Sequence, residues 1–159
     1  MKFSKIEKSQ KKITLFKDCF IHKVKKNKKH KAILFNMYNS RKNNMRISSN
    51  TNLKLEKHNN FVQNHPYRLW FLVCIKDHYI GNFYITLENI ISLNLYEVHV
   101  AKYNKIISAI LKKIKPLKAV LSIKRGEFTI NLSPQNKKIE KLLKNNNWKL
   151  IQKTYILDK

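Results

Sequence analysis

General acid–base chemistry in this chain depends on very few side chains, because only 9 of its 159 residues are aspartate or glutamate. The acids set aside first lie toward the chain ends or in a predicted turn: Glu7, Asp18, Asp77 and Asp158. Of the other titratable residues, Glu88, Glu97 and His99 lie on or beside predicted central strands. Proton abstraction needs a base within hydrogen-bond reach of the reacting group, so we rank Glu97 first and His99 second. The alternative for Glu97 is an exposed carboxylate that pairs with a nearby lysine.

Anion binding has further candidates in three arginines. A guanidinium offers fixed bidentate donors to phosphate, so Arg41, Arg46 and Arg68 could clamp a phosphorylated ligand. Each could equally be an ordinary surface arginine. His58 and His65, with their ordinary near-neutral pKa, could orient a hydroxyl or accept a proton, or could serve as helix-capping or loop residues. The residues alone leave these alternatives open.

Hydrophobic periodicity predicts alternating strands and helices that would position these side chains. A first strand is expected within 12–25, a hairpin from the runs 70–75 and 79–86, and later strands at 90–100, 128–132 and 148–157. Helices are expected at 31–38, from Leu53 with Asn52 as N-cap and Glu56 in the first turn, at 105–114 with Asn104 as cap, and at 136–143. The fold class is α/β of the α+β kind.

The predicted strand 90–100 matters most, because its alternation sorts the candidate residues onto two faces. One face would carry Leu93, Leu95, Glu97 and His99, and the other Asn94, Tyr96 and Val98. Glu97 and His99 would then lie side by side at the end of that strand.

Length and composition indicate one domain over 1–159, whose basic segment 1–30 contributes the first strand. We find neither an apolar run of the length a membrane span needs nor a signal-peptide core, so we expect a soluble cytoplasmic protein, monomeric or homodimeric, with no membrane partner. Cys19 and Cys74 lack ligand-spaced neighbours, which favours buried thiols over a disulfide or a metal site.

The charge is the most unusual bulk property, at +25 with 34 lysines and arginines. Such a field attracts nucleic acid, acidic membranes or phosphorylated small molecules. The alternative is compositional, because abundant Lys, Asn and Ile with scarce Gly, Ala and Pro are typical of AT-rich coding. The densest basic run, 23–31, could contact a polyanion, although a solvated loop explains it as well.

The C-terminal run NLSPQNKKIEKLLKNNNWKLIQKTYIL resembles the signature of the GNAT superfamily of acyl-CoA-dependent N-acetyltransferases. In that family a strand ends near an Asn that caps a helix, and a small-residue turn leads to an aromatic-started strand. Asn136 matches the capping Asn, and Asn147-Trp148 stands where the family usually has Gly-Phe. The family's frequent tyrosine acid would fall at about Leu143, which cannot donate a proton. The resemblance implies a mixed, mostly antiparallel sheet of six or seven strands flanked by about four helices.

Upstream, FNMYNSRKNNMRISSN and LEKHNNFV are similar to GNATs that acetylate amino groups on nucleotide-linked sugars in surface-glycan pathways such as pseudaminic and legionaminic acid synthesis. The segments HPYRLWFLV, GNFYITLENIISLNL and IQKTY extend this likeness, which covers roughly residues 33–157. It implies transfer of an acetyl group from acetyl-CoA directly to a small-molecule amine. The substrate-binding residues that it suggests are Asn39, Arg41, Arg46, Ser48, His58, His65, Arg68 and Tyr84.

The coenzyme loop departs from the family pattern. GNATs hold the pyrophosphate with a Gln/Arg-x-x-Gly-x-Gly/Ala loop whose N–H groups surround the phosphates. The chain has only two glycines, Gly81 and Gly126, so in the best register Val98, Ala101 and Tyr103 replace the family residues. Lys102, Lys105 and a helix N-terminus could compensate, whereas Tyr103 would fill the anion site or swing outward. The resemblance implies these coenzyme contacts: Leu95, Tyr96, Val98, Ala101, Lys102, Tyr103, Asn104, Lys105, Asn131 and Asn136.

Three hypotheses follow. An active N-acetyltransferase, with Glu97, His99 or Glu88 as base, requires an open V between the strands that begin near Ile90 and Phe128. A diverged GNAT that only binds a ligand or partner would have Tyr103 in the coenzyme cradle. A basic nucleic-acid-binding protein, which has the least motif support, would gather its lysines on one face.

Overall fold

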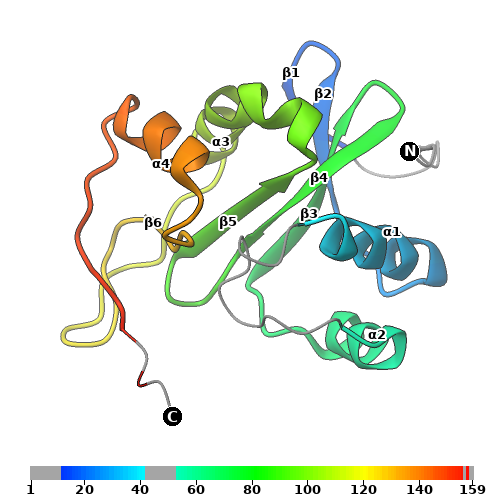
Figure 1. Cartoon of the computed structure of the whole chain (residues 1–159), viewed down its shortest axis with the longest axis horizontal. Helices are drawn as coiled ribbons and strands as arrows, with labels where there is room; N and C mark the ends of the chain where they lie inside the picture. Colours follow the sequence, from blue (N-terminus) through cyan, green and yellow to red (C-terminus); the bar gives the residue numbers. More distant parts are fainter. Residues whose placement is uncertain (1–11, 42–52, 156, 158–159) are drawn as a thin grey trace.

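The computed structural model describes residues 12–41, 53–155 and 157. Within them, a six-stranded mixed sheet in the order β1-β2-β3-β4-β5-β6 lies between two pairs of helices (Figure 1). Every neighbouring pair of strands is antiparallel except the last, β5 with β6. The expected fold class and the number of strands are therefore confirmed at the level of an α+β sheet protein.

The elements have these bounds. The strands are β1 (Ile13–Phe16), β2 (Cys19–Lys23), β3 (Leu69–Ile75), β4 (His78–Ile85), β5 (Ile90–Leu95) and β6 (Thr129–Ile130). The helices are α1 (Lys28–Asn39), α2 (Leu55–Asn64), α3 (Tyr103–Leu111) and α4 (Lys137–Lys144), with a 3₁₀-helix, η2 (Glu97–Lys102), leading into α3.

One face of the sheet is covered by α1 and α2. Ile33, Leu34 and Met37 from α1 and Val62 from α2 pack on strand residues that include Trp70 and Leu72. His58 joins these two helices, because its Nε2 lies 3.0 Å from the carbonyl oxygen of Lys31. Each of these two helices thus packs on the sheet through its apolar side.

The other face is covered by α3 and α4. Ile106, Ile107 and Ile110 of α3 are fully buried against strand residues such as Val73 and Phe83. Both faces of β3 are therefore apolar, which explains why its sequence reads as a continuous hydrophobic run. Residues alternate between the two cores, as Phe71 and Leu72 show.

The two cysteines are buried free thiols, as the sequence indicated. Burial raises the pKa of Cys19 to about 11 and that of Cys74 further still, so both remain protonated near neutral pH.

Several predicted boundaries are wrong. The expected first strand is a hairpin, because Asp18 adopts a left-handed φ of 63° between β1 and β2. Lys54 precedes α2 as its N-cap residue and makes no side-chain cap bond, whereas Asn52, the predicted cap, lies outside the described residues. The predicted final strand is also absent from the described part of 148–157.

No helix in the described ranges is both long and apolar enough to cross a membrane.

Candidate functional site

At the end of β5, the described sheet loses a strand pairing beside polar side chains. β5 pairs in parallel with β6 only at Ile90 with Thr129 and at Ile91 with Ile130. Since β6 ends at Ile130 and β5 continues to Leu95, the second half of β5 has no partner on that side in the described sheet. The acetyltransferase hypothesis predicts an open V between β5 and β6 beyond this point.

The face of β4 and β5 that α1 and α2 cover carries a row of polar residues, at positions where a core would be apolar. Cross-strand pairing sets Asn82 opposite Asn94 and Tyr84 opposite Ser92, and paired residues of a sheet share a face. The Asn82 amide approaches the sulfur of Met37 on α1, so this is the face that α1 and α2 cover. The sequence signal for this row is two polar residues at alternate positions in each of two apolar strands.

Arg41 reaches this row from the C-terminal end of α1. Its Nη1 donates to Oδ1 of Asn94 at 2.8 Å, and the Asn94 amide donates to the Ser92 hydroxyl at 3.1 Å. The guanidinium carbon lies 5.3 Å from the centre of the Tyr38 ring, a cation–π distance. We call Arg41, Tyr84, Ser92, Asn94 and Tyr96 the Arg41 site; all five are partly exposed.

A small hollow opens at this site. It is lined by Met37, Ser40, Arg41, Gly81, Asn94, Leu95 and Tyr96, and holds about 180 Å³ of empty space, open solvent included. A side chain at Gly81 would overlap the carbonyl oxygen of Asn94, so glycine permits β4 and β5 to approach here. The enclosed part of the hollow has room for about one water molecule, far less than the ~300–1,000 Å³ of a pocket for a drug-sized ligand. A phosphate or sugar hydroxyl would therefore contact the polar rim of the hollow from solvent rather than fill it.

Aromatic rings extend the site along β4. Tyr67 stacks on Tyr84 with the ring centres 4.0 Å apart and the planes 9° apart. Burial and the Tyr84 phenol raise the pKa of Tyr67, while the positive charge of Arg41 lowers it, so the guanidinium lies within electrostatic reach of the Tyr67 phenol. Arginine beside stacked phenols can bind an anion and a flat or hydroxylated group together.

The predicted coenzyme loop has a different structure. The expected strand stops at Leu95, and residues 97–102 form η2, whose i→i+3 bonds use the N–H groups that a pyrophosphate cradle would present. His99 N donates to Tyr96 O at 2.9 Å, and Tyr103 N donates to the Val100 carbonyl. Because η2 runs directly into α3, the start of α3 is not a free helix N-terminus.

Tyr103 takes neither of the two positions that we expected. Its side chain lies at the start of α3, in the core between the sheet and the pair α3 and α4. Burial there raises the pKa of the phenol. Lys105 turns toward β1, with Nζ 4.4 Å from the ring centre of Phe16, and Lys102 is exposed. We predicted that Lys102, Lys105 and a helix N-terminus could replace the missing glycines in binding pyrophosphate. The helix N-terminus of that set is not free in the structure.

The candidate bases are not brought together. Glu97 and His99 do not share a strand face, because three residues per turn put them about 120° apart around the 3₁₀ axis. Burial and the charge of Lys102 lower the pKa of His99. Glu88 lies in the exposed turn before β5, at the opposite end of that strand, where a hydrogen bond to Thr86 lowers its pKa.

No family model, curated protein or solved structure matches this chain.

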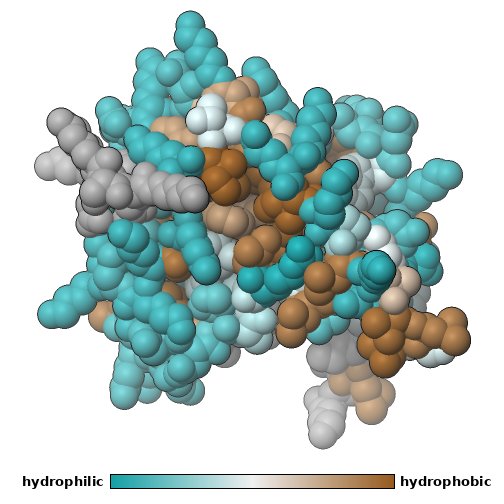
Figure 2. Space-filling model, turned by 180° about the vertical axis from the view of Figure 1, so that it is seen from behind, coloured by the Kyte–Doolittle hydropathy of each residue, from teal (hydrophilic) through white to brown (hydrophobic). Residues whose placement is uncertain are grey.

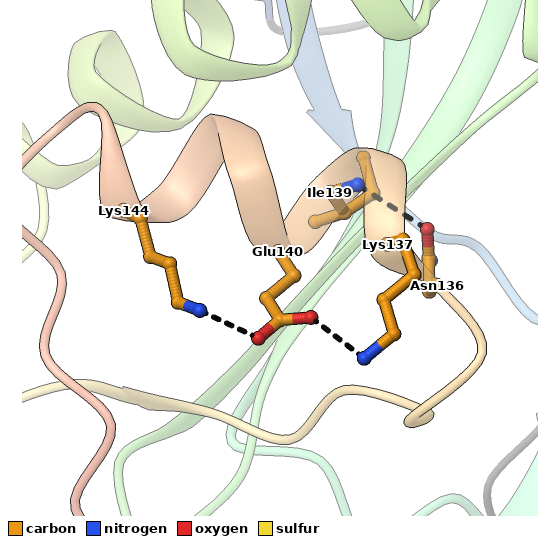
Figure 3. Close-up of polar contacts among 5 residues, drawn as sticks. All are labelled: Asn136, Lys137, Ile139, Glu140 and Lys144. Atoms are coloured by element: carbon orange, nitrogen blue, oxygen red, sulfur yellow. Dashed lines mark hydrogen bonds and ion pairs between the residues drawn. The ribbon is translucent and has the colours of Figure 1, made fainter.

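The other predicted coenzyme residues divide between the site and the scaffold. Leu95 and Tyr96 line the hollow, while Val98 is 76% exposed and Ala101 and Asn131 are exposed. Asn104 is not a cap: its amide donates to the Leu142 carbonyl at 3.1 Å and ties α3 to α4. Asn136 does cap α4, since its Oδ1 accepts the Ile139 N–H at 3.3 Å (Figure 3).

Among the predicted substrate residues, the hollow includes only Arg41, and Tyr84 lies on the same face nearby. His58 is buried between helices, and burial lowers its pKa. His65 packs on Trp70 with ring centres 4.9 Å apart, and Arg68 donates to the Lys115 carbonyl at 3.1 Å. Asn39 is exposed at the end of α1. Arg46 and Ser48 lie outside the described residues.

Proposed function

We propose that this chain is a GNAT-like protein that binds a small anionic, hydroxylated ligand at the Arg41 site and no longer holds acyl-CoA by a pyrophosphate cradle. The ligand class that fits the resemblance is a nucleotide-linked amino sugar. Its phosphate would pair with Arg41, and its hydroxyls would bond to Asn94, Ser92 and the tyrosine phenols. The chain would act by binding rather than by acetyl transfer.

The observation that carries this proposal is the structure of 97–103. A 3₁₀-helix consumes its own N–H groups, and the tyrosine at the second glycine position lies in the core. The amides that would neutralise the pyrophosphate are engaged before any ligand arrives. No carboxylate among the described residues lines the hollow to act as a general base.

A second candidate, active acetyl transfer, is favoured by the early divergence of β5 from β6. Parallel strands that part at this point leave backbone groups of β5 available to a pantetheine arm. This candidate requires coenzyme binding without the glycine loop.

Thermal shift separates the two candidates. We expect millimolar UDP-glucosamine to raise the Tm, acetyl-CoA to leave it unchanged, and Arg41→Gln to abolish the nucleotide-sugar shift; a ligand at about 100 times its Kd stabilises by about 2.7 kcal/mol. Arg125→Gln, an exposed arginine away from the site, is the matched control. A shift with acetyl-CoA, together with acetylated UDP-glucosamine by mass spectrometry, would establish the second candidate instead. No shift with UDP-glucosamine would remove the first.

A further inference from the structure

Residues 117–125 form a finger that the Arg41 site does not use. Val120 and Lys124 exchange two backbone hydrogen bonds of 2.9 Å, which closes a short hairpin. Ser122 turns the chain at the tip with a left-handed φ of 60°. The finger is thus a hydrogen-bonded projection and not an irregular loop.

The base of the finger is clamped by one buried side chain, Asn89. Its Nδ2 donates to the carbonyls of Leu117 and Arg125 at 2.8 and 2.9 Å, and its Oδ1 accepts the Leu117 N–H at 2.8 Å. Asn89 is fully buried in the turn between β4 and β5. A fully satisfied buried amide fixes the two ends of the finger to the sheet.

The tip of the finger is apolar. Leu121 is 93% exposed and Ile123 is 78% exposed, so both side chains stand in water. The C-terminal segment exposes four more large apolar or aromatic residues: Leu150, Ile151, Tyr155 and Leu157. The yellow finger and the red C-terminal segment project at the lower left of Figure 1. Figure 2, seen from behind, shows hydrophobic side chains at the corresponding lower right. Exposed apolar groups concentrated at one end indicate an interaction surface.

The charge around this apolar tip selects the partner. The finger itself carries Lys118, Lys124 and Arg125 and no acid; the acids beside its base are Glu88, which lies within electrostatic reach of Lys124, and Glu127. Residues 148–155 carry Lys149 and Lys153 and no acid. A second copy of a chain with a charge of +25 would be repelled. An anionic lipid surface offers hydrocarbon for the tip and phosphates for the basic residues at its base.

We propose that the finger is a membrane-surface contact, in which Leu121 and Ile123 insert at the headgroup–acyl boundary of an anionic bilayer. The cations of Lys118, Lys124 and Arg125 lie at the lipid phosphates. This contact is peripheral, departs from the expectation of no membrane partner drawn from the sequence, and is independent of ligand binding at the Arg41 site.

Vesicle sedimentation with the full chain tests this contact. The protein should bind phosphatidylcholine vesicles that contain phosphatidylglycerol and should not bind phosphatidylcholine alone. Leu121→Asp should weaken binding at least about tenfold, since it removes an inserted side chain and adds a repelled charge. Lys124→Gln should weaken binding about fivefold. Leu55→Asp, at an exposed leucine that begins α2, makes the same charge change away from the finger and should reduce binding far less.

Equal losses for Leu121→Asp and Leu55→Asp would overturn the proposal, because charge alone would then explain adsorption. A short DNA duplex is the other polyanion to test: if it binds tightly and loses affinity with Leu121→Asp as vesicles do, the finger contacts nucleic acid instead. Leu121→Trp supplies an independent readout, a blue shift of its fluorescence with anionic vesicles; the absence of a shift beyond that of the unmutated chain would also refute insertion.

Discussion

The position of the Tyr103 side chain is the clearest single-residue difference between the expected coenzyme loop and the observed one. A phenol in an anion cradle would be dispensable for folding, whereas a phenol buried between the sheet and α3 is part of the core. We expect Tyr103→Ala to lower the free energy of unfolding by about 3–5 kcal/mol, as large aromatic truncations do. Tyr103→Phe, the matched control, should cost less than about 1.5 kcal/mol. Urea denaturation measures both.

The same pair of variants tests whether the Tyr103 side chain obstructs a coenzyme site. If Tyr103→Ala were as stable as the unmutated chain and bound acetyl-CoA tightly, the side chain would block a cradle rather than build a core. That result would also weaken the proposed loss of coenzyme binding.

At the scale of elements, α4 shows what local sequence determines. Asn136 caps its start, and Glu140 bridges Lys137 and Lys144 at 3.2 and 2.9 Å on the exposed side (Figure 3). Its end is closed by Asn147 with φ 62°, where Trp148 N donates to the Leu143 carbonyl and Asn147 N to the Lys144 carbonyl. This is a Schellman closure with Asn147 at the position where Gly is usual.

A capping test belongs to this helix. Asn136→Ala should lower the free energy of unfolding by about 1 kcal/mol, because one N–H of the first turn loses its acceptor. Asn136→Asp, which keeps the acceptor and adds a charge favourable at a helix start, should retain most of the stability. Chemical denaturation at low salt measures the difference; an Ala variant as stable as the unmutated chain would show that water replaces the cap.

The elements also show where sequence reasoning stops. The hairpin of β3 and β4 and the helices α1, α3 and α4 follow from apolar periodicity and turn residues. The sequence predicts that the strand continues through residues 97–100, because Val98, His99 and Val100 have the composition of one, whereas tertiary context makes this segment helical. For the Arg41 site, the sequence predicts Arg41, Tyr84 and Tyr96 as ligand contacts but not Ser92 and Asn94. Those two join the site through the pairing of β4 with β5, and pairing register is not readable from either strand alone.

At the scale of the whole molecule, three histidines make stability depend on pH. Burial is the largest cause that lowers the pKa of His58, His65 and His99 below the ordinary value of 6.5. The unfolded chain then binds protons more readily than the folded one as pH falls below about 6.5, so protonation favours unfolding. The stability present above that pH should be lost progressively down to the lower folded-state pKa values.

Thermal unfolding from pH 8 to pH 5 checks this expectation. The Tm should fall below about pH 6.5, and His58→Gln should make the decline shallower because its amide does not titrate in that range. A decline of the same steepness in the variant would assign the effect to other groups.

The strand order has a consequence for how the chain reaches this structure. β3, β4 and β5 are consecutive in the chain and adjacent in the sheet, so residues 69–95 can pair through two short turns. β6 joins β5 only after η2, α3 and the finger, and gains two pairings for that long closure. Short-range pairing is kinetically favoured over long loop closure. The meander of β3 to β5 should therefore assemble first, and the edge that borders the finger should dock last during folding.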